Sequence, residues 1–150
     1  METVTFPQEE VVRFMSDNVI PLRLPHDHKP LAENFNVKWT PTLILLDKNG
    51  KEHHRTVGFL PPEELMASVL LGIGKMFFDV GKYQEAIQVL DKVVDQYEKS
   101  GAAPEAIFVR AVAQFKTTNE TSHLKRAYEI LKEKYPESEW AKRALPYRLL

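Results

Sequence analysis

Histidines are the first candidates for chemistry in this sequence, which contains five of them. His26 and His28 flank an aspartate, and His53 and His54 are adjacent. Imidazole nitrogens and carboxylate oxygens are zinc ligands, so this spacing raises the question of a metal site. Neighbouring strand residues point to opposite faces, and at most one of His53 and His54 joins such a site. Exposed loop histidines are the commoner origin of the pattern, and we expect neither a metal nor a cofactor.

Two carboxylate pairs, Glu9-Glu10 and Glu63-Glu64, have the residue types of a general acid and base. Each pair falls in the first turn of an expected helix, where the helix macrodipole favours negative charge. No glycine-rich phosphate loop and no Ser-His-Asp order accompanies them. We therefore predict no catalytic residue and lean against an enzyme.

The chain contains no cysteine. A thiolate is the nucleophile of thiol-disulfide exchange and a common ligand of structural zinc. Neither chemistry is available to this chain.

The elements that must position any site are centred on a short apolar run, Thr42–Leu46, which predicts a buried strand. Pro41 stands directly before it, and a proline cannot donate to a strand ladder. A cis peptide bond after Thr40 is one way to accommodate it. The following Asp47–Gly50 has the Asn-Gly chemistry of a hairpin turn. Pro61 then opens a helix.

The run Phe35–Leu43, the Asp47–Gly50 turn, Val57–Phe59 and the helix from Pro61 together resemble the second half of a thioredoxin-like domain. The resemblance implies a cis proline at Pro41, beside the place of the family's active site. Because the chain has no cysteine, the resemblance extends to the fold and not to the redox chemistry.

The preceding residues predict a helix from Thr5 to about Asn18, a strand over Val19–Leu24, and a loop with a short helix over His26–Asn34. In a complete thioredoxin-like domain a Cys-x-x-Cys turn precedes this point. Met1–Phe6 resembles the end of the helix after that turn, so we expect the chain to begin just beyond the place of the active site.

The missing part of the family's fold includes the strand between Val19–Leu24 and Thr42–Leu46. Either the two strands pair directly in a reduced three-stranded sheet, or an exposed edge pairs with another chain. We expect a homo-oligomer through the exposed sheet edge.

The second half of the sequence is helical. Phe77-Phe78-x-x-Gly81-x-Tyr83-x-x-Ala86-Ile87 resembles the core of a tetratricopeptide repeat. The spacing of Leu90, Val93 and Tyr97 recurs later in the chain, as an α-solenoid requires. That later spacing consists of Tyr128, Leu131 and Tyr135. We predict one good repeat, one degenerate repeat and a capping helix that includes Trp140.

The predicted fold class is therefore α/β followed by all-α. A truncated thioredoxin-like β-α-β-β-α unit with a small sheet occupies residues 1–73, and tetratricopeptide-like helical repeats with a capping helix occupy residues 74–150. The 43% hydrophobic content supports a packed core.

Charge and hydropathy limit the partners and the compartment. The formal net charge is −1, from 20 basic and 21 acidic side chains. This balance predicts no attraction to nucleic acid or to an anionic membrane. No signal peptide and no membrane-spanning apolar run is visible, so a cytoplasmic protein is expected.

These features favour a non-catalytic protein-protein interaction module with a protein or peptide partner. The predicted peptide-binding residues are Trp39, Thr40, Pro41, Gly58 and Phe59, although core packing is nearly as good an explanation for Trp39. One alternative is a truncated or accessory relative of a thiol-disulfide oxidoreductase whose Cys-x-x-Cys motif lies upstream. Another is a scaffold in which the helical repeats do all the binding.

Overall fold

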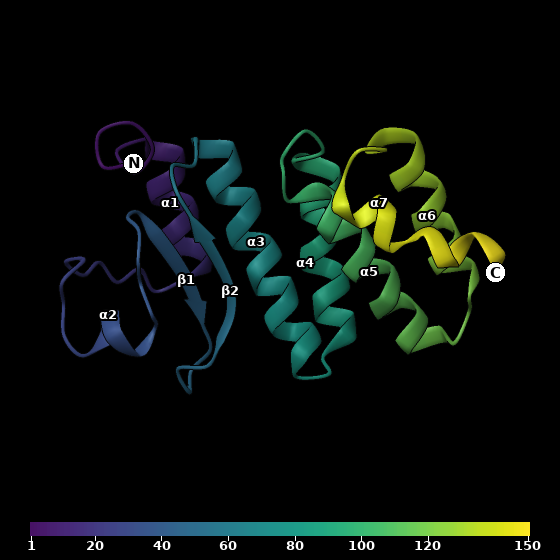
Figure 1. Cartoon of the computed structure of the whole chain (residues 1–150), viewed down its shortest axis with the longest axis horizontal. Coiled ribbons are helices and arrows are strands. Elements are labelled where there is room, and N and C mark those ends of the chain that lie inside the picture. The colour runs from purple at the N-terminus through teal and green to yellow at the C-terminus, as the bar shows by residue number, and fades with distance from the viewer.

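The computed structural model describes all 150 residues, which form a row of elements from a β-hairpin end to a helical end (Figure 1). The first elements are α1 (Glu9–Asn18), α2 (Leu31–Asn34), β1 (Thr42–Leu46) and β2 (Glu52–Val57). The helices α3 (Pro62–Asp79), α4 (Tyr83–Gln96), α5 (Ala103–Thr118), α6 (Ser122–Lys134), α7 (Glu139–Arg143) and the 3₁₀ helix η1 (Leu145–Leu149) follow. A small sheet followed by helices confirms the predicted fold class.

The sheet has two antiparallel strands, β1 and β2, as the sequence predicts for this part of the chain. The turn between them is held by Asp47, whose Oδ1 accepts hydrogen bonds from the backbone N–H groups of Asn49 at 2.8 Å and Lys51 at 3.0 Å. Gly50 adopts a φ of 79°, a left-handed conformation that glycine tolerates best. The expected turn chemistry is therefore present.

The predicted strand over Val19–Leu24 is wrong. This segment has extended backbone at Val19, yet it belongs to no sheet. The sheet has two strands and not three, and residues 20–24 make no backbone hydrogen bond. A strand exists only with a neighbour to pair with, and Figure 1 shows the segment leaving α1 toward α2 instead of running alongside β1.

Helix α3 lies between the two ends of the molecule and packs on both. It begins as predicted, with Pro61 before its first residue and Pro62 at that residue, and with two glutamates in its first turn. Toward the hairpin, Leu65 and Val69 form a cluster with Val11 of α1, and side chains of β1 pack against it. The predicted division between residues 73 and 74 falls inside this continuous helix, and it remains a prediction.

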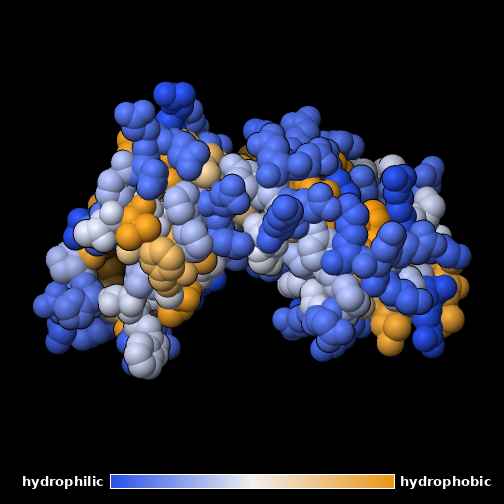
Figure 2. Space-filling view, turned by 90° about the horizontal axis from the view of Figure 1, so that it is seen from above, coloured by the Kyte–Doolittle hydropathy of each residue, from blue (hydrophilic) through white to orange (hydrophobic).

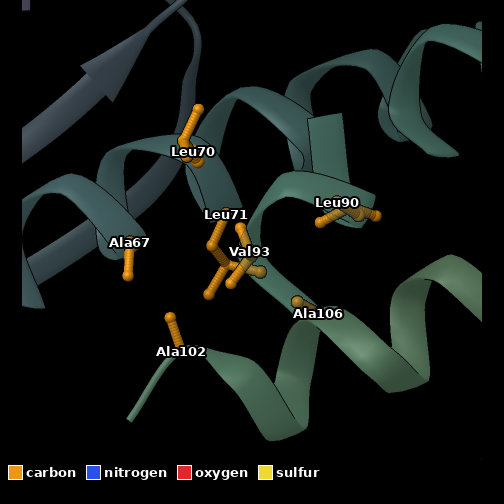
Figure 3. Close-up of a cluster of buried hydrophobic side chains, with 7 residues drawn as sticks. All are labelled: Ala67, Leu70, Leu71, Leu90, Val93, Ala102 and Ala106. Carbon is orange, nitrogen blue, oxygen red and sulfur yellow. The ribbon is translucent and has the colours of Figure 1, made fainter. Parts of the chain in front are cut away.

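Toward the repeats, α3 shares a second cluster with α4 and the start of α5 (Figure 3). Its members are small or branched aliphatic side chains that let three helices meet closely: Ala67, Leu70, Leu71, Leu90, Val93, Ala102 and Ala106. Leu90 and Val93 are the apolar positions that the repeat pattern singled out, and both are fully buried.

A third cluster joins α5, α6 and the C-terminal helices. The turn between α5 and α6 begins at Asn119, the residue after the end of α5, which adopts a left-handed φ of 59°. Trp140 of α7 lies against Phe108 of α5, with ring centroids 5.2 Å apart. The last helices therefore cover the open end of the repeats, the position expected of a cap.

Replacing Gly74 by alanine tests the closeness of α3 and α4. An added Cβ would meet Leu90 Cγ and Cδ2 at 2.6 Å, and Leu90 is fully buried and has little room to move. Overpacking costs about 1–3 kcal/mol, and the gain of about 1 kcal/mol in helix propensity offsets only part of it. We expect a net loss of up to about 2 kcal/mol in the free energy of unfolding, measured by urea denaturation.

Gly101→Ala is the matched control, because its Cβ would meet only Glu64 Oε2 at 3.5 Å, an ordinary contact. Its free energy of unfolding is expected to stay within about 0.5 kcal/mol of the unaltered chain. A Gly74→Ala variant more stable than the parent would contradict the close approach of the two helices.

Candidate functional site

The five predicted peptide-binding residues lie together at the open end of the hairpin, opposite the Asp47 turn. The backbone N–H of Gly58 donates to the carbonyl of Pro41 at 2.8 Å, one step beyond the Thr42–Val57 pair of the ladder. The Thr40–Pro41 peptide bond is cis. Thr42 Oγ1 donates to the carbonyl of Trp39 at 2.6 Å and closes the chain just before β1.

Two aromatic side chains of this group are exposed. Trp39 is 75% exposed and Phe59 is 53% exposed, and neither belongs to a core cluster. The core-packing explanation for Trp39 therefore does not apply. Figure 2 shows apolar side chains gathered at the end of the molecule that carries the hairpin and α1, whereas the repeats are mostly polar in this view.

One edge of β1 has no partner strand. In an antiparallel ladder, alternate residues direct their N–H and C=O groups to opposite edges. Because Pro41 faces Gly58, the groups of Thr42 and Ile44 face away from β2. No charged side chain lies within Thr42–Leu46, so the edge lacks the charges that usually discourage pairing.

His53 occupies a position that sequence reasoning missed. The expectation of exposed histidines is wrong here, because the His53 side chain is fully buried between two carboxylates. Its Nδ1 lies 2.7 Å from Asp79 Oδ2 at the end of α3, and its Nε2 lies 3.1 Å from Asp47 Oδ2 in the hairpin turn.

The register pairs Leu45 with His54 and Leu46 with Glu52, so His53 is the extra residue of a β-bulge. Regular strand alternation does not hold at a bulge, and both histidines contact α3, through Asp79 and Ser68. The alternation expected from the sequence therefore gave no signal for this arrangement.

The environment of His53 sets its protonation. Burial alone would lower its pKa, but hydrogen bonds to Asp79 and Asp47 outweigh burial and raise the pKa above its usual value. The same contact lowers the pKa of Asp47. The His53 imidazole therefore ties the hairpin turn to the far end of α3, and both carboxylates favour its protonated form.

His54 has the opposite electrostatic environment. Its Nε2 lies 3.0 Å from Ser68 Oγ of α3. Burial, and then the positive charge of Lys75, lower its pKa. The pKa values of the two neighbouring histidines are thus shifted in opposite directions. No group of three or more His, Asp or Glu side chains in the chain is placed to hold a metal ion.

Comparison with known families agrees with this architecture. Residues 1–70 match the model of the thioredoxin-like domain, and residues 68–100 match that of the tetratricopeptide repeat. Searches of curated proteins and of solved structures found no match. Residues 1–100 therefore contain a thioredoxin-like segment followed by a tetratricopeptide repeat, which confirms the predicted order of the two.

The two family matches meet in α3, which supplies the end of the first and the beginning of the second. The repeat match covers α4 as well, and the predicted degenerate repeat lies beyond it, where α5 and α6 pack on each other. None of the helices is both long enough and apolar enough to cross a membrane.

Replacing Asp79 by asparagine tests the charged contact at His53, since asparagine keeps the shape of the side chain and removes its charge. A raised folded-state pKa means that His53 contributes stability that is complete below its unfolded pKa of 6.5 and is lost as the pH rises through the folded pKa. We expect Asp79→Asn to lower the free energy of unfolding by about 1 kcal/mol at pH 6, and by less at pH 9. Urea denaturation at both pH values measures this.

His54 is the internal control for that experiment. Its pKa is lowered, so its contribution is present above the unfolded pKa and is lost as the pH falls through the folded value. The contribution of His54 is the same in the parent chain and in Asp79→Asn, so it cancels in the difference between their free energies of unfolding. An equal difference at pH 6 and pH 9 would contradict a protonated His53.

Proposed function

We propose that this chain is a non-catalytic protein-protein interaction module, and that Trp39, Thr40, Pro41, Gly58 and Phe59 bind an extended peptide. The observation that carries the proposal is the pair of exposed aromatic rings at the end of an unpaired strand edge. A thioredoxin-like segment and a tetratricopeptide repeat both fit an interaction module. With no cysteine, this chain supplies no thiol for exchange with a partner.

The binding mode follows from the backbone and the two rings. An extended peptide adds to a sheet edge through main-chain hydrogen bonds, and side-chain contacts give the specificity. Here the free groups of Thr42 and Ile44 supply the main-chain partners. Trp39 and Phe59 supply large apolar contacts near the Pro41–Gly58 pair, and aromatic anchors of this kind carry much of the energy at interfaces.

The proposed partner is a protein, and the charge balance gives no reason for nucleic acid. The chain has a net charge of −1, and its helical repeats provide a second surface for a protein partner. The two surfaces lie on opposite sides of α3 (Figure 1). A single partner that contacts both surfaces gains affinity, because its second contact forms within the same complex.

Replacing Trp39 by alanine tests the peptide site. Peptides selected from a random library on the intact chain serve as the probe, and fluorescence anisotropy measures their dissociation constants. We expect Trp39→Ala to weaken binding by about 2 kcal/mol, or roughly thirtyfold, because the variant loses a large exposed anchor. Its fold should be unchanged, since Trp39 contacts no core cluster.

Leu149→Ala is the matched control, because Leu149 is another strongly exposed apolar side chain at the opposite end of the molecule. This variant is expected to bind as the parent does. If Trp39→Ala binds every selected peptide with the parent's affinity, the peptide site is not at the hairpin, and the helical repeats carry the interaction instead.

A further inference from the structure

The segment Val19–Leu24 has the side-chain pattern of a strand without a sheet. Its three even-numbered apolar side chains are all exposed, Ile20 at 98%, Leu22 at 76% and Leu24 at 39%. An alternating apolar face of this kind is normally buried against a core. No residue from 20 to 24 makes a backbone hydrogen bond within the chain. Both the apolar face and the backbone of this segment therefore lack partners.

One edge of the segment is fit for pairing and the other is not. In an extended strand, the N–H and C=O groups of Ile20, Leu22 and Leu24 point to one edge, and those of Pro21 and Arg23 point to the other. Pro21 has no N–H and interrupts its own edge. The edge formed by Ile20, Leu22 and Leu24 has all of its N–H and C=O groups. The segment is therefore suited to the border of a sheet, with Pro21 facing outward.

The same chain presents a matching acceptor. The edge of β1 formed by Thr42 and Ile44 is unpaired and uncharged, and β1 and β2 form only a two-stranded sheet. Three or more strands are usually needed for a sheet to be stable by itself. Within one chain the segment and the edge do not meet.

We propose that a second copy of this chain binds at the β1 edge, with Val19–Leu24 of each copy pairing with β1 of the other. This inference rests on the proposed role of the edge in protein interaction and names the partner of that edge. Each copy supplies one strand and receives one, as a two-fold symmetric interface requires. Both sheets thereby become three-stranded.

Two features favour a second copy over a single foreign strand. A stable interface buries about 800 Å² from each partner. Reciprocal exchange forms two segment–β1 pairings in one dimer, whereas a lone peptide forms only one, so the dimer buries more surface. Charge also permits the pairing. Arg23 is the only charged residue in the two stretches, and the whole chain carries a net charge of only −1, so two copies repel each other little.

A pair of proline substitutions tests the geometry. Leu22→Pro removes an N–H from the pairing edge, and Arg23→Pro removes one from the opposite edge. Neither N–H is hydrogen-bonded within one chain, so both variants should fold. Arg23→Pro also removes an exposed ion pair with Glu2, which contributes little stability. Circular dichroism and urea denaturation verify the folds.

Sedimentation equilibrium then measures the dissociation constant of the dimer. We expect the parent chain to reach a two-chain mass, Leu22→Pro to raise the dissociation constant by about tenfold or more, and Arg23→Pro to change it by less than about threefold. Leu22→Pro should have the larger effect because it removes a hydrogen bond to β1 of the other copy, and the dimer loses this bond twice. Arg23→Pro removes an N–H that makes no such bond. Hydrogen exchange gives a second readout, with the Ile44 amide protected in the parent at high concentration and unprotected in Leu22→Pro.

Three results would overturn the inference. They are a monomeric parent chain at millimolar concentration, equal effects of the two prolines, and a dimer in which the Ile44 amide exchanges freely. If the chain is a monomer and the Ile44 amide becomes protected from exchange only after a selected peptide is added, the β1 edge binds a foreign strand and not a second copy. Failure of self-association is distinguishable from failure of the peptide site, because the effect of Trp39→Ala on peptide binding is measured separately in monomeric Leu22→Pro.

Discussion

Helix α3 is the constraint on which the rest of the structure depends. An ordinary surface helix buries one stripe, but the middle of α3 is buried on every side, continuously from Leu65 to Gly72 and again at Gly74. Its two sides serve different neighbours, since Val69 faces α1 and the hairpin whereas Leu71 faces α4. Neither the hairpin nor the repeat has a complete core without this helix.

The hairpin depends on α3 because two strands alone are marginal in water. Leu43 and Leu45 pack toward α3 from one face of β1, and the buried His53 joins the Asp47 turn to Asp79 at the end of the helix. The turn end is thus fixed, while the opposite end displays Trp39 and the free edge of β1. Rigidity at one end and an unpaired edge at the other suit a recognition surface, since a preorganised site loses less entropy on binding.

The sequence predicted the elements whose signals are local. The Asp47–Gly50 turn, the start of α3 at its prolines and the helical spacing around Leu90 all depend on neighbouring residues. Val19–Leu24 has the composition of a strand, but a strand needs a partner at a distance, which composition does not supply. His53 was missed for a similar reason, because its two carboxylates lie 6 and 26 residues away. The exposure of Trp39 likewise depends on which elements surround it.

The central claim is that α3 joins the thioredoxin-like segment and the helical repeat into one cooperative unit. Native-state hydrogen exchange of the monomer in increasing urea tests it most directly. The account predicts that the slowest amides of β1, at Leu43 and Leu45, open with the same free energy and the same urea dependence as the amide of Leu90 in α4. Opening of the β1 amides at a free energy about 2 kcal/mol or more below that of Leu90 would contradict it, because the hairpin would then unfold while the repeat stays folded.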